Sequence, residues 1–256
     1  MGGQGCPRSV RCFAPLASLL FGLSAAAGEP TLPPGADPKQ VAQELVQNLR
    51  SAVPEEDSVL TGTLKLRARD GTTRSVPIEC TVRIGEKSWR AGYQTFSSNS
   101  APERLAIVHW PNKPNDYFYG HGTNDPRSVA TAKANIPIGG SDFWLTDLGL
   151  DFLHWPQQRI IKTEMRKSRW CNVLESINPK PASGGYGKVI SWLDKETGGP
   201  ILADAFDASG KLLKNFELKS VKKGQLHEIS IYNTQTKSTT RLEFDIKPKE
   251  EKNAGP

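Results

Sequence analysis

The sequence has 256 residues, with 33 Lys and Arg against 27 Asp and Glu, a formal net charge of +6, and 37% hydrophobic residues. The length is enough for one β-rich domain, or two small ones, with a buried core. A charge this mild, with both signs interspersed, argues against a protein that binds nucleic acid through a basic, aromatic face.

The N-terminus has the pattern of a secretory signal peptide. Arg8 and Arg11 precede an apolar run over residues 13–23, and the small residues SAAA follow at 24–27. The run has about 11 residues, whereas a helix that spans a bilayer needs roughly 20. We therefore expect residues 1–27 to be a signal peptide cleaved after Ala27 and the mature protein to be exported and soluble, with an uncleaved anchor as the alternative.

A linker and a helix are predicted next. Residues 28–36 are rich in proline, Asp37 is a typical N-cap residue, and Pro38 suits the first position of a helix. The apolar residues that follow recur every four positions and form one stripe on an otherwise polar segment. We expect this helix to dock on a sheet and to cover its core or a cavity.

Strand patterns dominate from residue 58 onward. The run SVLTGTLKLRA places Leu64 and Leu66 on one face, and Asp70-Gly71 is a typical hairpin turn. About a dozen such runs follow one another through short turns, which favours an antiparallel sheet that has to curl because strands twist. Residues 123–140 lack periodicity and are expected to form a long surface loop, and residues 248–256 are expected to be a disordered tail.

Aromatic and aliphatic residues gather in the middle of the chain, in the segment FWLTDLGLDFLHW that follows a predicted helix cap at Ser141-Asp142. One interpretation is ordinary core packing, and the other is an apolar lid over the open side of a curled sheet. An apolar pocket under such a lid would bind acyl chains with about 0.8 kcal/mol per buried methylene group. The hydrophobic hollow and its lid are predicted to comprise Val41, Leu45, Leu49, Leu64, Leu66, Phe143, Trp144, Leu148, Phe152 and Leu153.

Two cysteines, Cys80 and Cys171, remain after the expected cleavage. In an oxidising compartment they could form a disulfide, and closing a loop of about 90 residues would contribute roughly 4 kcal/mol. Both lie inside strand-like runs, however, so two buried free thiols are at least as good a prediction.

The sequence carries no motif of a catalytic or metal centre. No two histidines have the H-x-x-x-H spacing, and there is no G-x-S-x-G elbow, Walker loop or G-x-G-x-x-G. Carboxylates such as Asp204 and Asp207 leave a paired-acid hydrolase as an alternative. We predict that the protein is not an enzyme, that it needs no metal or cofactor, and that it does not bind nucleic acid.

Two basic runs stand out, Arg166-Lys167-Ser168-Arg169 and Lys222-Lys223. The simplest interpretation is that both are solvated faces. A weak attraction to an anionic membrane surface is the alternative.

Several longer motifs follow in order over residues 139–246: GSDFWLTDL, RWCNVLESINPK, YGKVISWLDKETGGPILADAFDASGKLLKNFEL and RLEFDI. They resemble the outer membrane lipoprotein-sorting protein family, which shares the fold of LolA, LolB and RseB, whereas the first half of the chain is similar only in pattern. The resemblance implies a mainly β (α+β) fold over residues 37–247: a strongly curved antiparallel half-barrel of about 11 strands with helices covering its concave face.

The resemblance also implies a function. In LolA the hollow of the half-barrel holds lipoprotein acyl chains, so we expect a periplasmic carrier that binds acyl chains of lipoproteins or lipids and delivers them towards the outer membrane. Its partners would be the acyl lipid or lipoprotein and transport proteins of the inner and outer membranes. The alternative is an envelope-stress sensor or a partner-binding protein of the same fold, because a fold alone does not fix a function.

Overall fold

The computed structural model describes residues 35–96, 101–222 and 225–245. The predicted signal peptide at 1–27 and the predicted tail at 248–256 lie outside these ranges, as does most of the predicted linker at 28–36. None of the helices in the described ranges combines the length and the apolar character of a membrane span.

The described strands form one antiparallel sheet of 13 strands, so the expectation of about 11 was too low. The short strand β6 lies in the segment 123–140, where the sequence pattern predicts a loop. Three residues are too few to show a period of two. The first group of strands comprises β1 (Ser58–Arg67), β2 (Thr73–Ile84), β3 (Trp89–Thr95), β4 (Glu103–His109), β5 (Asp116–His121) and β6 (Arg127–Val129). The second group comprises β7 (Gln157–Arg166), β8 (Arg169–Ile177), β9 (Lys188–Asp194), β10 (Pro200–Phe206), β11 (Leu212–Lys222), β12 (Gln225–Asn233) and β13 (Ser238–Phe244).

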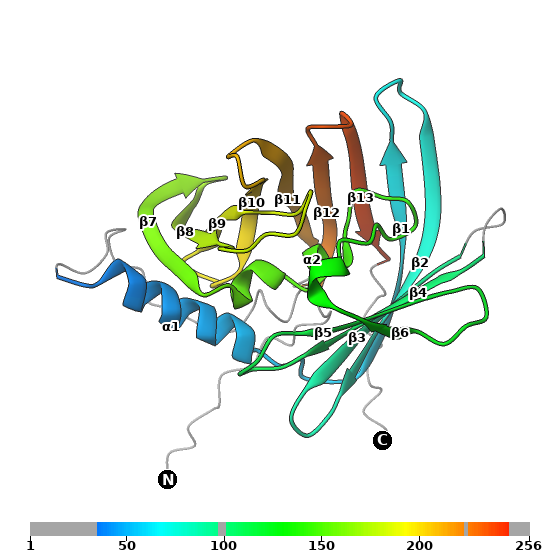
Figure 1. The fold of residues 1–256 in the computed structure, drawn as a ribbon, viewed down its shortest axis with the longest axis horizontal. Helices are drawn as coiled ribbons and strands as arrows, with labels where there is room; N and C mark the ends of the chain where they lie inside the picture. Colours follow the sequence, from blue (N-terminus) through cyan, green and yellow to red (C-terminus); the bar gives the residue numbers. More distant parts are fainter. Residues whose placement is uncertain (1–34, 97–100, 223–224, 246–256) are drawn as a thin grey trace, which may run out of the picture.

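The sheet consists of two meanders joined at its centre (Figure 1). Consecutive strands pair within β1–β6 and within β7–β13, and β1 also pairs with β13, from Gly62 opposite Phe244 to Arg67 opposite Thr239. We call this β1–β13 pairing the seam. Glycine is needed at position 62 of the seam because a Cβ atom there would lie 2.4 Å from the carbonyl oxygen of Glu243. The order places β6 at one edge of the sheet and β7 at the other.

The connection between these two edges, residues 130–156, has to run across a face of the sheet, and we call it the crossover. It contains the 3-10 helices η1 (Thr131–Lys133) and η2 (Asp151–His154) and the one-turn helix α2 (Leu145–Leu148). Its first part is buried against β1–β5, β12 and β13, with Ile138 at 1% and Leu145 at 0% exposure. The prediction of a long surface loop at 123–140 is therefore wrong for the buried part of this segment. Its backbone is irregular, so its buried residues follow no sequence period that would indicate burial.

Helix α1 (Pro38–Ser51) begins where the sequence predicted. The Asp37 side chain accepts a hydrogen bond from the backbone N–H of Lys39 at 2.9 Å, and Pro38 occupies the first turn. Its buried residues are Ala42, Val46 and Leu49. They pack with η2 and with residues of β7–β10.

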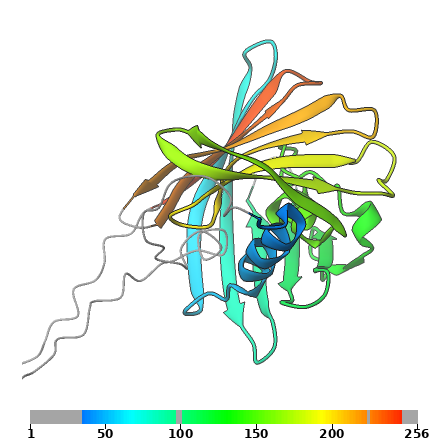
Figure 2. The ribbon, with the colours of Figure 1, turned by 90° about the vertical axis from the view of Figure 1, so that its left-hand side faces the viewer.

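Helices form only part of the layer that packs on the sheet. Figure 2 shows α1 and the crossover on the same side of the sheet, with α1 near β7. Phe216 of β11 packs against both the cluster that contains α1 and the cluster that contains α2. Much of the layer is therefore the irregular chain of the crossover, where the resemblance implied helices.

Candidate functional site

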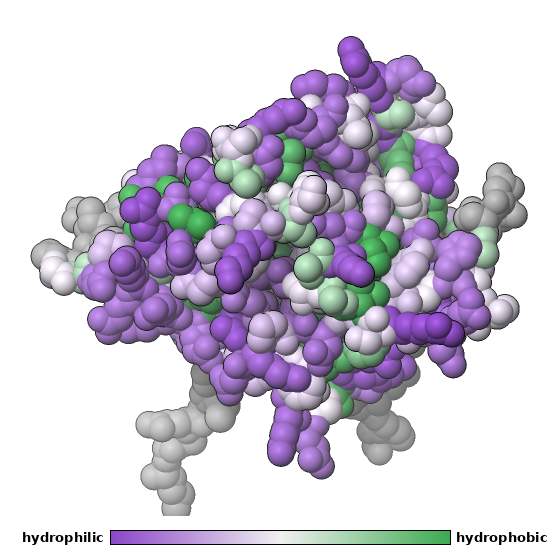
Figure 3. Space-filling model, in the orientation of Figure 1, coloured by the Kyte–Doolittle hydropathy of each residue, from purple (hydrophilic) through white to green (hydrophobic). Residues whose placement is uncertain are grey.

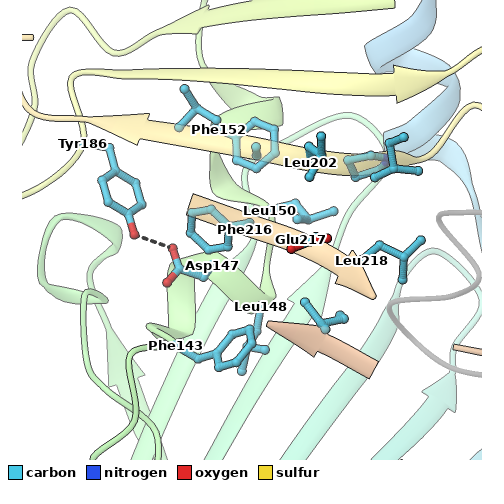
Figure 4. A pocket seen from close by; sticks show the side chains of 15 residues that line it. Phe143, Asp147, Leu148, Leu150, Phe152, Tyr186, Leu202, Phe216, Glu217 and Leu218 are labelled. Atoms are coloured by element: carbon cyan, nitrogen blue, oxygen red, sulfur yellow. Dashed lines mark hydrogen bonds between the residues drawn. The ribbon is translucent and has the colours of Figure 1, made fainter. Parts of the chain in front are cut away.

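An apolar pocket lies between the crossover and strands β9–β12, and we call it the crossover pocket. Its cavity volume is about 80 Å³. Figure 4 shows Phe143 and Leu148 of the crossover beside Phe216 and Leu218 of β11. The pocket is lined by Phe143, Asp147, Leu148, Leu150, Phe152, Tyr186, Val189, Pro200, Ile201, Leu202, Ala203, Phe216, Glu217, Leu218 and Ile229.

The lining makes the pocket suited to an apolar ligand. Only Asp147 and Glu217 carry a carboxylate, and Asp147 is occupied by protein partners (below). A sealed apolar cavity of about 150 Å³ accommodates benzene. At about 80 Å³ the crossover pocket has room for only a few methylene groups, so a longer chain would enter only if one wall moved.

The wall formed by the crossover is attached to the sheet through side chains. Between residues 134 and 153, the backbone–backbone hydrogen bonds found among the described residues run within the crossover, as from Ile138 N–H to the Phe143 carbonyl at 3.0 Å. An isolated bridge between Pro137 and Trp144 also lies inside it. The crossover can therefore be displaced without breaking a β ladder.

A buried cation provides one attachment. Lys214 of β11 has 2% of its side chain exposed, and its Nζ donates to Asp147 Oδ2 at 3.0 Å and to the Asp142 carbonyl at 2.7 Å. The same Nζ lies 3.4 Å from the ring centroid of Trp144. Burial lowers the pKa of the Lys214 ammonium, and the neighbouring Asp147 opposes that shift.

Tyr186 completes this arrangement. Its hydroxyl donates to Asp147 Oδ1 at 2.9 Å (Figure 4), and its ring stacks on Trp144 with centroids 4.8 Å apart. Burial raises the pKa of Tyr186 well above its usual value, which keeps the hydroxyl protonated as a donor. We call Trp144, Asp147, Tyr186 and Lys214 the Lys214 cluster.

Further polar contacts tie the crossover to the sheet on either side of α2. The Asp142 carboxylate accepts hydrogen bonds from Asn233, Ser238 and Thr240 at 3.0, 2.7 and 2.9 Å, which ties it to β12 and β13. After α2, the Tyr117 hydroxyl donates to Asp151 at 3.1 Å. Burial raises the pKa of the Asp151 carboxyl.

The structure brings three of the ten predicted hollow residues into the crossover pocket: Phe143, Leu148 and Phe152. Trp144 lies beside it in the Lys214 cluster. The others lie elsewhere: Val41, Leu45, Leu49 and Leu153 pack in the α1 cluster, and Leu64 and Leu66 belong to the core of the first meander.

Sequence reasoning missed most of the wall that the sheet contributes. Val189, Ala203, Phe216, Leu218 and Ile229 come from β9–β12 and line the pocket. Their alternation with polar residues shows which side chains share a face. It does not show which face lies under the crossover.

The two cysteines are free and buried, so the predicted alternative of a disulfide does not occur and two free thiols are present. Cys80 lies in the core of the first meander, whereas Cys171 packs with Val173 and Trp192 in a separate cluster. Burial raises the pKa of Cys171 to about 11 and raises that of Cys80 further, which makes both thiols unreactive at neutral pH.

The two carboxylates that leave a paired-acid hydrolase as an alternative, Asp204 and Asp207, both make structural hydrogen bonds. Asp204 accepts a hydrogen bond from Asn215 at 2.7 Å, and Asp207 accepts from residues of its own turn. No group of three or more His, Cys, Asp or Glu in the described residues has an arrangement that could bind a metal ion. His109 stacks on Trp89 with ring centroids 3.8 Å apart.

Comparison with solved structures defines the class of fold. A DUF1329 family protein from Desulfovibrio piger superimposes with a TM-score of 0.68 at 15% identity, over 82% of this chain and 92% of that one. A domain from Vibrio parahaemolyticus assigned to the outer membrane lipoprotein-sorting proteins gives a TM-score of 0.65 at 20% identity, over 81% and 92%. A LolA superfamily protein from Nitrosomonas europaea gives 0.57 at 15% identity, over 82% and 93%.

The fold is thus that of the LolA superfamily and of outer membrane lipoprotein-sorting domains, which confirms the resemblance seen in the sequence. A family model described as "Uncharacterized protein" matches residues 96–251, more than half of the chain. The chain belongs to that family. No curated protein matches the sequence.

Proposed function

We propose that the protein is a periplasmic carrier that binds acyl chains of lipoproteins or lipids in the crossover pocket and delivers them towards the outer membrane, without catalysing a reaction. One observation carries the proposal: an apolar pocket has the sheet as one wall and, as the other, a crossover without backbone hydrogen bonds to that sheet among the described residues. The description of the Vibrio domain as lipoprotein-sorting agrees with this proposal.

Binding would enlarge the pocket by displacing the crossover. Each methylene group that leaves water contributes about 0.8 kcal/mol, so eight of them would supply about 6 kcal/mol before the cost of opening. That gain has to offset the loss of contacts such as those from Lys214 to the crossover. A long acyl chain therefore binds better than a short one, because its gain grows while the opening cost stays fixed.

The first test is native mass spectrometry of the mature protein purified from the periplasm without detergent, followed by organic extraction and by titration with a fluorescent fatty acid. The wild type should carry or take up acyl lipid. Ala203→Phe should lose uptake, because Ala203 lines the pocket at 5% exposure and a phenyl ring would fill the space.

Leu66→Met is the matched control. Leu66 was predicted to line the hollow, but it lies in the other half of the sheet, outside the crossover pocket. This variant should bind as the wild type does, and circular dichroism should show that both variants are folded. A wild-type protein without lipid and without fatty-acid uptake would rule out the carrier and would favour the alternative, an envelope-stress sensor or partner-binding protein.

A further inference from the structure

An exposed apolar pair lies at the tip of the β7–β8 hairpin. Met165 is 52% exposed and Trp170 43% exposed. The two residues are opposite each other in the register of β7 and β8, so their side chains share one face of the hairpin. Neither contributes to any of the three buried clusters of the described residues.

The turn between them presents basic side chains. Lys167 and Ser168 both have positive φ, 50° and 59°, as a two-residue type I′ hairpin requires. Arg166 and Arg169 pair directly across the turn. Three cations therefore lie within two residues of the Met165–Trp170 pair. We call residues 165–170 the hairpin tip.

The charge around the tip remains positive after its ion pairs are counted. Lys162, Arg166, Lys167, Arg169 and Lys219 form ion pairs with only three carboxylates, those of Glu164, Asp194 and Glu217. Five cations against three carboxylates leave a surplus of two positive charges. This surplus is complementary to an anionic surface.

The tip also borders the crossover pocket. The Lys167 Nζ donates to the Leu218 carbonyl at 3.2 Å and forms an ion pair with Glu217, and both of these β11 residues line the pocket. A surface that the tip contacts is therefore close to the apolar pocket.

We propose that the hairpin tip docks the protein on a membrane surface that contains anionic phospholipid. Trp170 and Met165 enter the boundary between headgroups and acyl chains, and Arg166, Lys167 and Arg169 contact phosphate groups. An indole has an apolar ring and a polar N–H, which suits the bilayer interface, and long basic side chains reach from there to the headgroups. Protection of an edge strand against aggregation would explain the lysine and arginine side chains. It would not explain the exposed tryptophan beside them.

Docking through the hairpin tip rests on the proposed function and gives it a place where lipid passes between a membrane and the crossover pocket. Its test measures membrane binding and not acyl uptake, so that either proposal can fail without the other. The wild type should sediment with vesicles of equal parts phosphatidylglycerol and phosphatidylcholine and much less with pure phosphatidylcholine. Binding should weaken as salt is added, because the attraction is screened.

Trp170→Ser should reduce the bound fraction about tenfold at low vesicle concentration, as expected for the loss of one interfacial aromatic side chain. Arg166→Glu should reduce it for phosphatidylglycerol vesicles in particular. The control is Phe96→Ser, which removes an aromatic side chain that is 44% exposed in the other half of the sheet and should leave binding unchanged. All three positions are exposed, so the variants should fold.

Two results would overturn the proposal: a wild type that binds neither kind of vesicle, or a Trp170→Ser variant that binds as well as the wild type. Equal binding to pure phosphatidylcholine would remove the role of the basic residues. If the tip variants bound vesicles normally but lost a crosslink to another protein, the surface would be a protein-docking site and the lipid assignment would be wrong.

Discussion

At the scale of single residues, the most unusual feature is a lysine ammonium buried next to an aspartate. Lys214 and Asp147 each have 2% of the side chain exposed. The desolvation of two charges offsets much of their attraction, so such a pair is weak evidence for stability, whereas removing one partner is costly. Because Lys214 belongs to the sheet and Asp147 to the crossover, the pair specifies how these two segments meet.

We predict that Lys214→Ala lowers the free energy of unfolding by about 3–5 kcal/mol, because it leaves the Asp147 carboxylate buried without a cation. The measurement is urea denaturation. Lys211→Ala, an exposed lysine just before the same strand, is the control and should change the value by less than about 0.5 kcal/mol.

The double variant Lys214→Met with Asp147→Leu separates the cost of an unpaired buried charge from the loss of the Lys214–Asp147 contact. It should be more stable than Lys214→Ala, since no unpaired charge remains in the core. A single variant as stable as the wild type would show that water reaches Asp147 and that the pair does not hold the crossover.

Two histidines should make the fold sensitive to mild acid. Burial, reinforced by His154, lowers the pKa of His109 to about 3. Burial, reinforced by Arg50, lowers the pKa of His154 to about 4. In the unfolded chain both would have a pKa of about 6.5, so between about pH 6.5 and 4 the unfolded state takes up protons that the folded state does not.

The contribution of these two neutral histidines to the free energy of unfolding is therefore fully present above about pH 6.5. It should fall by roughly 1.4 kcal/mol per pH unit for each histidine as the pH decreases towards the folded pKa. Denaturation at a series of pH values measures this slope, and His154→Gln should remove its share of it. A stability that stays level down to pH 4.5 would contradict the assignment of two buried neutral imidazoles.

At the scale of elements, the pairing of β1 with β13 joins the two meanders. Gly62 allows the close approach, since an added Cβ would lie 2.4 Å from the Glu243 carbonyl oxygen and 3.2 Å from the Phe244 Cα. Both neighbours are backbone atoms and cannot rotate away. The seam is therefore intolerant of a side chain at this position.

We predict that Gly62→Val lowers the free energy of unfolding by about 2–3 kcal/mol, although valine favours strands, because the methyl groups push the two backbones apart. Thr63→Val is the control on the next residue of the same strand and should be nearly neutral. Thermal unfolding compares the two variants. If both had the same midpoint, the seam would have room for a side chain.

The start and the apolar face of helix α1 could be predicted from the sequence, whereas the strands that it covers could not. The cap residues Asp37 and Pro38 placed its start correctly, because these preferences are local. The predicted stripe comprises Val41, Leu45 and Leu49 with Ala42 and Val46. Ala42, Val46 and Leu49 are buried, and Val41 and Leu45 are partly buried against the same cluster. The stripe does not show which strands it covers, because that depends on pairings between distant segments.

At the scale of the whole molecule, the order of the strands accounts for the pocket. The chain builds one meander out to the edge strand β6, crosses the sheet to the opposite edge strand β7, and builds the second meander back to β1. The crossover is thereby laid over the sheet without joining it as a strand. In the view of Figure 3 the face shows scattered apolar patches within a largely polar surface.

The crossover is also where prediction from sequence succeeded only in part. Phe143, Leu148 and Phe152 were assigned to the hollow because aromatic and aliphatic residues cluster there, and they do line the pocket. Leu64 and Leu66 were assigned from alternation alone, and they lie in the core of the other meander. Alternation identifies a buried face, but each meander has one.

Local features could be read from the amino-acid sequence: the cap of α1, most of the strands and their hairpins, and an antiparallel sheet too long to stay flat. Each of these depends on residues close together in the chain. Three features became visible only in the folded chain: β1 pairs with β13, the two cysteines lie in separate clusters, and Ala203 and Phe216 face the crossover. These features depend on pairings between distant segments, and a period of two gives the face of a strand without naming its partner.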